Sequence, residues 1–148
     1  MRLASLLFLL TGLLTAHAGA SGNDNPQISL QISGHTVSAE IAHTQWSRSQ
    51  GLMYRESLAE NSGMLFVFTE ASYYSMWMKD TYIPLSVAFI DEQGVILNIE
   101  DMQPETRTAH DSEGMAKYAL EMNKGWFAAR KIAAGARVTG LNKAPAAE

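Results

Sequence analysis

The chain has 148 residues, no cysteine and a formal net charge of −4, from 11 basic and 15 acidic residues. This composition excludes a disulfide-stapled scaffold, and it makes nucleic acid and anionic membranes unfavourable partners. The length suits a single domain that buries its own core.

The first residues have the pattern of a secretory signal peptide. Arg2 precedes an apolar run from Leu3 to Leu14, and Ala16-His17-Ala18 then provides a cleavage site of the A-x-A type. The run is too short to cross a bilayer as a stable helix, and no second segment of spanning length follows it. We therefore expect residues 1–18 to be removed and residues 19–27 to form a disordered leader. The protein would then be periplasmic or secreted, with no membrane span after cleavage.

Strand-like runs fill the middle of the chain. The first two alternate apolar and polar residues on either side of Gly34, which predicts a hairpin. Four more runs follow, and a D-E-Q-G turn joins the last two into a second hairpin. These six runs predict an antiparallel sheet, and they cover residues 28–33, 35–42, 64–68, 73–78, 85–90 and 95–100.

A short helix is predicted directly after the first hairpin. Thr44 is of the residue type that caps helix N-termini, and Gly51 is of the type that ends helices. The helix would cover residues 45–50. We expect Trp46 and Leu52 to face inward.

The last third of the chain alternates again. Residues 118–122 read as a strand, and Asn123 would cap a second helix over residues 124–132. Residues 136–139 form a predicted closing strand, and we expect residues 141–148 to be a frayed tail.

These elements define a mainly β fold, a β-rich α+β domain over residues 28–140. Its runs are separated by turns and not by regular crossover helices, which argues against a parallel α/β sheet. We therefore predict a small antiparallel β-sandwich or open barrel of about seven strands with two short helices.

Seven phrases distributed along the chain resemble one family. They are R-x-x-G-L-M-x-R from Arg48, G-M-L-F-x-F from Gly63, W-M-K-x-T-x-I-P-L from Trp77, F-x-D-x-x-G-x-I from Phe89, M-x-P from Met102, A-L-E from Ala119 and G-W from Gly125. In this order and spacing the sequence resembles the bacterial and archaeal domain of unknown function 192. The resemblance implies a small exported or membrane-anchored β-rich domain, with no established activity.

The sequence departs from the usual family phrase at two positions. Asp80 stands where the family commonly has asparagine, and Ser86 stands where it commonly has aspartate. If both positions line one pocket, its net charge is kept while its geometry changes. A role that needs an aspartate at Ser86 is therefore not carried over.

Lys79, Asp80 and Tyr82 form the first candidate site, between two predicted strands and before a proline that cannot donate to a sheet ladder. If the chain turns here, Lys79 would bind a carboxylate or another anion at the mouth of the sheet, beside the loop of residues 102–110. The alternative is a solvated turn with a weak surface ion pair.

Glu121 is the second candidate, because it interrupts an otherwise apolar strand. A carboxylate inside a small domain needs a partner, and Arg48 or Arg55 would supply a bidentate one. Such a buried pair is more often architectural than catalytic, so a structural role is favoured over a functional one.

Met76 and Met78 suggest a third possibility, since two positions apart on a strand they share a face. Thioethers with a neighbouring tryptophan, here Trp77, are soft ligands for copper(I). The alternative is that both methionines fill the core. The histidines after the signal peptide show no metal-ligand spacing, so we predict no metal site and no cofactor.

Four aromatic residues offer an open binding interpretation, as a platform for sugars. They are Tyr73, Tyr74, Trp77 and Tyr82.

The sequence has no G-x-S-x-G elbow, no H-E-x-x-H motif, no phosphate loop and no cysteine nucleophile. The leading interpretation is a non-enzymatic exported module that binds a small ligand or a periplasmic protein. A hydrolase or isomerase with Asp80 or Glu121 as general base is the main alternative. Copper(I) binding through Met76 and Met78 is the third.

Overall fold

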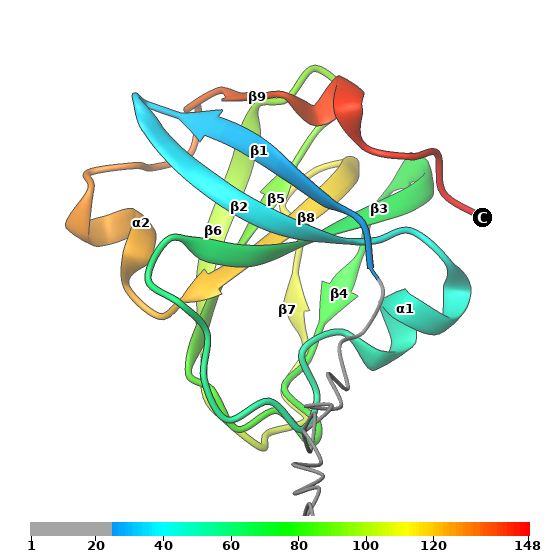
Figure 1. The fold of residues 1–148 in the computed structure, drawn as a ribbon, viewed down its shortest axis with the longest axis vertical. Coiled ribbons are helices and arrows are strands. Elements are labelled where there is room, and N and C mark those ends of the chain that lie inside the picture. Colours follow the sequence, from blue (N-terminus) through cyan, green and yellow to red (C-terminus); the bar gives the residue numbers. More distant parts are fainter. Residues whose placement is uncertain (1–24) are drawn as a thin grey trace, which may run out of the picture.

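The computed structural model describes residues 25–148. The predicted signal peptide and residues 19–24 of the predicted leader lie outside the described residues. Nine strands, two α-helices and one 3₁₀ helix follow one another along the described chain (Figure 1). They are β1 (Gln27–Ile32), β2 (His35–Ala42), α1 (Gln45–Gln50), β3 (Ser62–Ser72), β4 (Ser75–Met76), β5 (Leu85–Ile90), β6 (Ile96–Met102), β7 (His110–Asp111), β8 (Ala116–Asn123), α2 (Trp126–Ala129), β9 (Val138–Thr139) and η1 (Leu141–Lys143).

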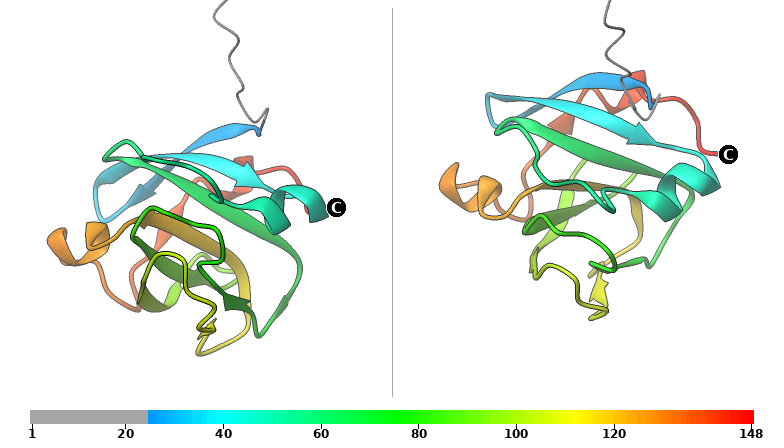
Figure 2. Two further views of the ribbon diagram at one scale, coloured as in Figure 1. Left: turned by 90° about the horizontal axis from the view of Figure 1, so that it is seen from below. Right: turned by 60° about the horizontal axis from the view of Figure 1, so that its bottom comes forward.

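Seven of the strands form one sheet in the order β6-β5-β8-β3-β2-β1-β9, while β4 and β7 form a separate two-stranded ladder. The sheet is curled into a half-barrel (Figure 2). Its two ends approach each other through the β9 segment, which pairs with β1 and also reaches the start of β6. There Val95 and Arg137 form an isolated bridge, and Val138 N donates to Gly94 O over 2.7 Å.

The mainly β fold with two short helices is confirmed, as are both hairpins, β1–β2 and β5–β6. The expectation of a wholly antiparallel sheet is wrong at one place, because β2 and β3 run parallel. The chain between them contains α1 and a long loop, and parallel neighbours need a crossover of that kind.

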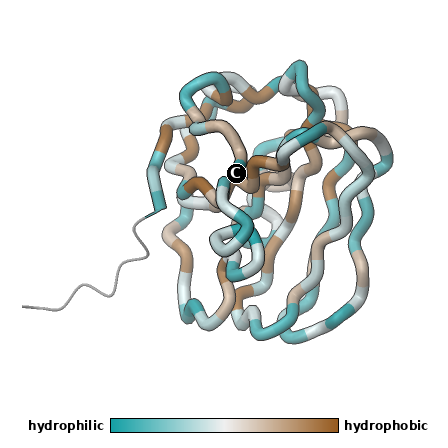
Figure 3. Tube along the Cα trace, turned by 90° about the vertical axis from the view of Figure 1, so that its right-hand side faces the viewer, coloured by the Kyte–Doolittle hydropathy of each residue, from teal (hydrophilic) through white to brown (hydrophobic). Residues whose placement is uncertain are grey.

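Both faces of the central strands are buried, and each face has its own apolar cluster. The inner cluster takes side chains from all seven strands of the sheet, among them Leu65 of β3 and Leu120 of β8. The outer cluster holds their chain neighbours Phe66 and Ala119, as the two-residue period of a strand requires. Figure 3 shows hydrophobic and hydrophilic residues alternating along the chain. The outer face needs a cover, which α1 and the segments around β4 provide.

The run 73–78 was predicted as a full strand of the sheet, and this is wrong. Only Ser75 and Met76 are strand, and they pair with β7 outside the main sheet. The register between β3 and β8 shifts between Val67 and Ser72, where the chain leaves the sheet. The segment is therefore free to cross the outer face.

The first helix forms as predicted, with a capping box between Thr44 and Ser47 and with Gly51 at its end. Leu52 is buried, but Trp46 is 65% exposed, which contradicts its expected inward orientation. The buried residue of α1 is Ser47, because its hydroxyl is part of the cap.

Two features near the C-terminus differ from expectation. Asn123 does not cap α2; its Nδ2 donates to Leu58 O over 2.9 Å, and the shorter helix begins after Gly125 in the left-handed region. The tail is not frayed, because Glu148 N donates to His43 O over 2.9 Å and Ala144 packs against the inner cluster. In residues 25–148, no helix combines the length and apolarity needed to cross a membrane.

Candidate functional site

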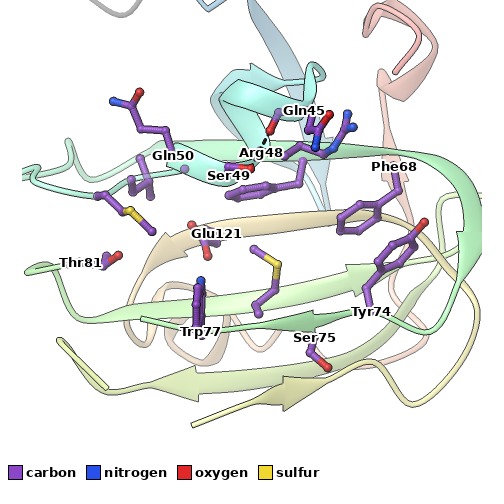
Figure 4. Close-up of a pocket in the computed structure, with 15 residues that line it drawn as sticks. Gln45, Arg48, Ser49, Gln50, Phe68, Tyr74, Ser75, Trp77, Thr81 and Glu121 are labelled. Atoms are coloured by element: carbon purple, nitrogen blue, oxygen red, sulfur yellow. Dashed lines mark hydrogen bonds between the residues drawn. The ribbon is translucent and has the colours of Figure 1, made fainter. Parts of the chain in front are cut away.

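A cavity of about 390 Å³ lies on the outer face of the sheet, under α1 (Figure 4). It has an apolar and aromatic floor from β3, one wall from α1 and the turn after it, and one wall from the segment around β4. The lining residues are Gln45, Arg48, Ser49, Gln50, Gly51, Leu52, Met53, Phe66, Phe68, Tyr74, Ser75, Met76, Trp77, Thr81 and Glu121.

Glu121 provides the carboxyl group in this lining, and it is 4% exposed. Its strand, β8, lies between β3 and β5, where its register partners Met64 and Val87 are fully buried. The two-residue period that points Leu120 to the inner cluster points Glu121 to the outer face. Figure 4 places its carboxyl between α1 and Trp77.

Burial raises the pKa of Glu121 from 4.5 to about 8. The cause is loss of water around the charged form, and the described part of the chain supplies no compensating cation or hydrogen bond. None of the ion pairs among residues 25–148 includes Glu121. At neutral pH its carboxyl group is therefore mostly protonated, and it is available to form a hydrogen bond or an ion pair with a molecule in the cavity.

Neither predicted arginine partner reaches Glu121, so that expectation is wrong. Arg55 makes a bidentate pair with Glu40, at 2.5 and 2.6 Å. Arg48 lines the cavity, but its guanidinium donates to backbone carbonyls of His43, of Val67 at 3.1 Å and of Glu148 at 2.8 Å. The Arg48 side chain therefore joins α1, β3 and the tail.

Lys79, Asp80 and Tyr82 lie outside the cavity lining, although Thr81 belongs to it. Lys79 Nζ and Asp80 Oδ2 are 3.7 Å apart and both side chains are more than a third exposed, which is the geometry of a weak surface pair. The Tyr54 hydroxyl donates to Asp80 at 3.4 Å, and the Asp80 charge raises the pKa of Tyr54. Tyr82 packs edge-on against Tyr54.

The loop between β6 and β7 adjoins this turn, as expected. Glu105 N donates to Thr81 O over 3.0 Å, and Met78 N donates to Thr106 O over 3.1 Å. The loop supports the turn that carries Thr81, but it does not line the cavity.

Ser86 and Asp80, the two departures from the family phrase, have different partners. The buried Ser86 hydroxyl donates to Asp101 Oδ1 over 2.5 Å and accepts from Gly125 N over 2.9 Å. Asp80 meets Lys79 and Tyr54 instead. The carboxylate that contacts Ser86 therefore belongs to Asp101, its register partner on β6, and not to Asp80.

A double-mutant cycle should show this partnership. We expect Ser86→Ala and Asp101→Asn to couple by about 1 kcal/mol in the free energy of unfolding, because each removes the same hydrogen bond. Ser86→Ala and Asp80→Asn should be additive within about 0.5 kcal/mol. Urea unfolding of the two cycles measures both values. Coupling to Asp80 that equals the coupling to Asp101 would contradict the separation of the two sites.

Met76 and Met78 both pack in or against the outer cluster, but they differ in their access to the cavity. Met76 lines the cavity, whereas Met78 is fully buried in the outer cluster. His110 is the register partner of Met76 in the β4–β7 ladder, and its buried Nε2 has no hydrogen-bond partner among residues 25–148. Within the described chain, no three His, Cys, Asp or Glu side chains gather as a metal-binding group.

The four aromatic residues do not form one platform. Tyr74 and Trp77 line the cavity, while Tyr73 is largely exposed and Tyr82 packs against Tyr54. Sequence reasoning missed Phe66 and Phe68 as cavity walls. No local signal distinguishes them from core residues.

The fold and the site together define a small half-barrel β domain with a ligand-sized lateral cavity built around one buried carboxyl group. The chain belongs to the domain of unknown function 192 family, described as an uncharacterized ACR, whose pattern matches residues 28–140. The predicted family membership is thus confirmed.

Two solved structures are similar to this chain. One is described as a candidate transcription regulator from Sinorhizobium meliloti 1021, with 34% identity, a TM-score of 0.74, and coverage of 77% of this chain and 93% of that one. The other is a protein of unknown function from Novosphingobium aromaticivorans, with 28% identity, a TM-score of 0.73, and coverage of 76% and 84%. A search of curated proteins finds no match.

Proposed function

We propose that this domain is a non-enzymatic binding module that takes a small ligand into the Glu121 cavity. The observation that carries the proposal is a side chain that is 96% buried, bears a carboxyl group without a protein partner, and lines an open cavity. A buried polar group normally has a hydrogen-bond partner, so a free one at a cavity suggests that the partner is a ligand.

The walls of the cavity support a ligand with an apolar body. Phe66, Phe68, Tyr74 and Trp77 supply aromatic surface, and polar side chains such as Gln45, Gln50 and Ser75 complete the lining. Small-molecule sites are usually concave, mostly apolar and about this size, with a small number of polar groups that fix orientation.

A hydrolase or isomerase with Glu121 as general base is the second candidate function. It is favoured by the pKa of about 8, which would let Glu121 exchange a proton near neutral pH. Against it, Arg48 is the other charged residue of the lining, and an arginine cannot act as the complementary acid or base. Asp80 is a poorer base, since it is exposed and paired with Lys79.

We further propose an exported, periplasmic or secreted protein, on the basis of the signal-peptide pattern of residues 1–18. Its partner would be a small ligand or another periplasmic protein. The regulator description of the Sinorhizobium meliloti protein is not extended to this chain, because the net charge of −4 is unfavourable for DNA. Copper(I) binding through Met76 and Met78 is not proposed, because only Met76 lines the cavity.

Binding can be tested by NMR of the exported protein with labelled methionine methyl groups. Met53 and Met76 line the cavity, whereas Met122 is buried in the inner cluster on the other face of the sheet and serves as an internal reference. We expect some members of a library of single-ring aromatic amines, alcohols, amides and carboxylates to shift Met53 and Met76 selectively, with dissociation constants of about 0.1 to 1 mM.

A blocking variant makes the test specific. Ser49 is an exposed residue of α1 at the cavity, so Ser49→Trp should fill the opening and weaken binding by about tenfold or more. Ser29→Trp places the same side chain on an exposed position of β1, outside the cavity lining, and should leave binding unchanged. If no library member shifts Met53 and Met76, or if Ser49→Trp binds as well as wild type, the proposed function is wrong. Turnover of a bound fragment, detected by mass spectrometry, would favour the enzyme instead.

A further inference from the structure

Building on the proposed function, we infer that the ligand of the cavity is an organic cation, an ammonium group on an apolar or aromatic body, whose charge meets the Glu121 carboxylate. Three features of the cavity support this ligand class. They are an acid without a counter-cation, hydroxyl and guanidinium donors that are already engaged, and aromatic walls.

The acid of the cavity lacks a counter-cation from the protein. Arg48, the basic residue of the lining, donates to three backbone carbonyls and makes no ion pair with Glu121. The register partners of Glu121 on β3 and β5 are Met64 and Val87, so the flanking strands supply no charge. A cationic group of the ligand would supply the counter-charge that Glu121 lacks.

The donors of the lining are largely occupied, which disfavours an anionic ligand. The Ser49 hydroxyl donates to Gln45 O over 2.8 Å, and the Thr81 hydroxyl donates to Lys79 O over 3.0 Å. With the Arg48 guanidinium engaged as well, the side-chain donors left for a carboxylate or phosphate are the neutral amides of Gln45 and Gln50, and no unengaged cation of residues 25–148 lines the cavity. An ammonium group needs acceptors, and the Glu121 carboxyl oxygens are free to accept.

The aromatic walls are suited to a cation. Phe68 and Tyr74 are stacked with ring centroids 3.7 Å apart, and Trp77 lies on the opposite side of Glu121 from α1 (Figure 4). Aromatic faces attract ammonium groups within about 6 Å of the ring centroid. Trp77 already has two protein cations beside its ring, Lys79 Nζ and the Arg107 guanidinium, each 5.9 Å from the centroid. The rings left for a ligand ammonium are therefore those of Phe66, Phe68 and Tyr74.

Binding of an ammonium group would be linked to proton release. The titratable groups of the lining are Glu121 on β8, Arg48 on α1 and Tyr74 beside β4. Of these, Glu121 is the group whose pKa lies near 8, and a cation beside it would lower that pKa. Below pH 8 the arriving ammonium should therefore displace close to one proton from Glu121.

Four probes with one ring test the charge preference on the exported protein: benzylammonium, benzyltrimethylammonium, benzyl alcohol and benzoate. Methionine-methyl NMR titration at pH 7 gives the affinities, and calorimetry in buffers of different ionisation enthalpy gives the protons released. We expect both cations to bind about tenfold or more tightly than benzyl alcohol, with benzoate weakest and with proton release only for the cations.

The variant Glu121→Gln keeps the shape and removes the charge. It should weaken benzylammonium by about tenfold or more, abolish its proton release, and leave benzyl alcohol within about threefold. Glu113→Gln removes an exposed carboxylate outside the lining and should change neither value. Circular dichroism of each variant confirms folding before titration.

The failure of this inference is distinguishable from failure of the proposed function. If benzyl alcohol or benzoate binds at Met53 and Met76 as tightly as the cations, the ligand is not a cation but the binding module stands. If the cations bind without dependence on Glu121, the inference is also wrong. If none of the four probes binds, the cation inference is overturned, and the wider fragment library then decides the proposed function separately.

Discussion

Between pH 5 and pH 8 this domain should lose about 3 kcal/mol of folding stability through Glu121 alone. The effect follows from one group whose pKa is about 8 in the folded protein and near 4.5 in the unfolded chain. Each unit of pKa difference corresponds to about 1.4 kcal/mol between the two states.

The direction of the effect follows from which state holds the proton. Above about pH 4.5 the unfolded chain releases the Glu121 proton, whereas the folded protein keeps it until the pH approaches 8. The folded state therefore binds more protons in this interval, and its stability falls as the pH rises. The contribution is fully present below the unfolded pKa and is gone above the folded pKa.

Urea unfolding of the purified protein at one-unit steps from pH 5 to pH 9 measures this loss. Glu121→Gln should flatten the profile over this interval, while Glu113→Gln, an exposed control, should keep the wild-type slope. Taking the difference between wild type and Glu121→Gln cancels the histidines and the other acids that both proteins share. Identical slopes for wild type and Glu121→Gln would mean that Glu121 is not the group that titrates.

The cost of Glu121 to stability supports its assignment to function. A side chain at the centre of an apolar face, between Met64 and Val87, would stabilise the fold more as a hydrophobic residue of similar volume. Above pH 7 we therefore expect the fold to tolerate Glu121→Met well. Residues that reduce stability without an architectural partner are typical of binding and catalytic sites.

Local patterns in the sequence predicted the local structure correctly. The hairpin around Gly34, the D-E-Q-G turn and the capped helix after Thr44 each depend on a few adjacent residues, and each was recovered. The parallel pairing of β2 with β3 was not predicted, since strand order depends on packing between distant segments. The segment 73–78 has strand-like composition, but it leaves the sheet after the register shift in β3.

The candidate site was predicted only in part, for a similar reason. Glu121 was identified because a charged residue in an apolar strand is visible in the sequence alone. The predicted pairing of Glu121 with Arg48 or Arg55 was wrong, because the preference of Arg55 for Glu40 depends on how β2 and the loop after α1 meet in space. The aromatic residues of the cavity could not be distinguished from core residues either, since Phe66 and Phe68 alternate along β3 as core residues do.

Gly63→Ala should destabilise the domain by about 2 to 3 kcal/mol, although the backbone at Gly63 suits any residue. A Cβ at this position of β3 would lie 2.4 Å from Met122 Sδ and 2.5 Å from Glu121 O. The sulfur belongs to a fully buried side chain, and the oxygen belongs to the backbone of the neighbouring strand β8. Relief of the overlap therefore requires β3 and β8 to move apart beside Glu121.

Gly114→Ala is the matched control for this prediction. Its Cβ would meet only the flexible end of Leu97, at 3.3 and 3.4 Å, so we expect a change within about 0.5 kcal/mol. Urea unfolding compares the two variants, and the NMR signals of Met53 and Met76 report the cavity. A displacement of β8 should shift both signals in Gly63→Ala and neither in Gly114→Ala. Equal stabilities for the two variants would mean that β3 and β8 are not as closely packed beside Glu121 as the structure indicates.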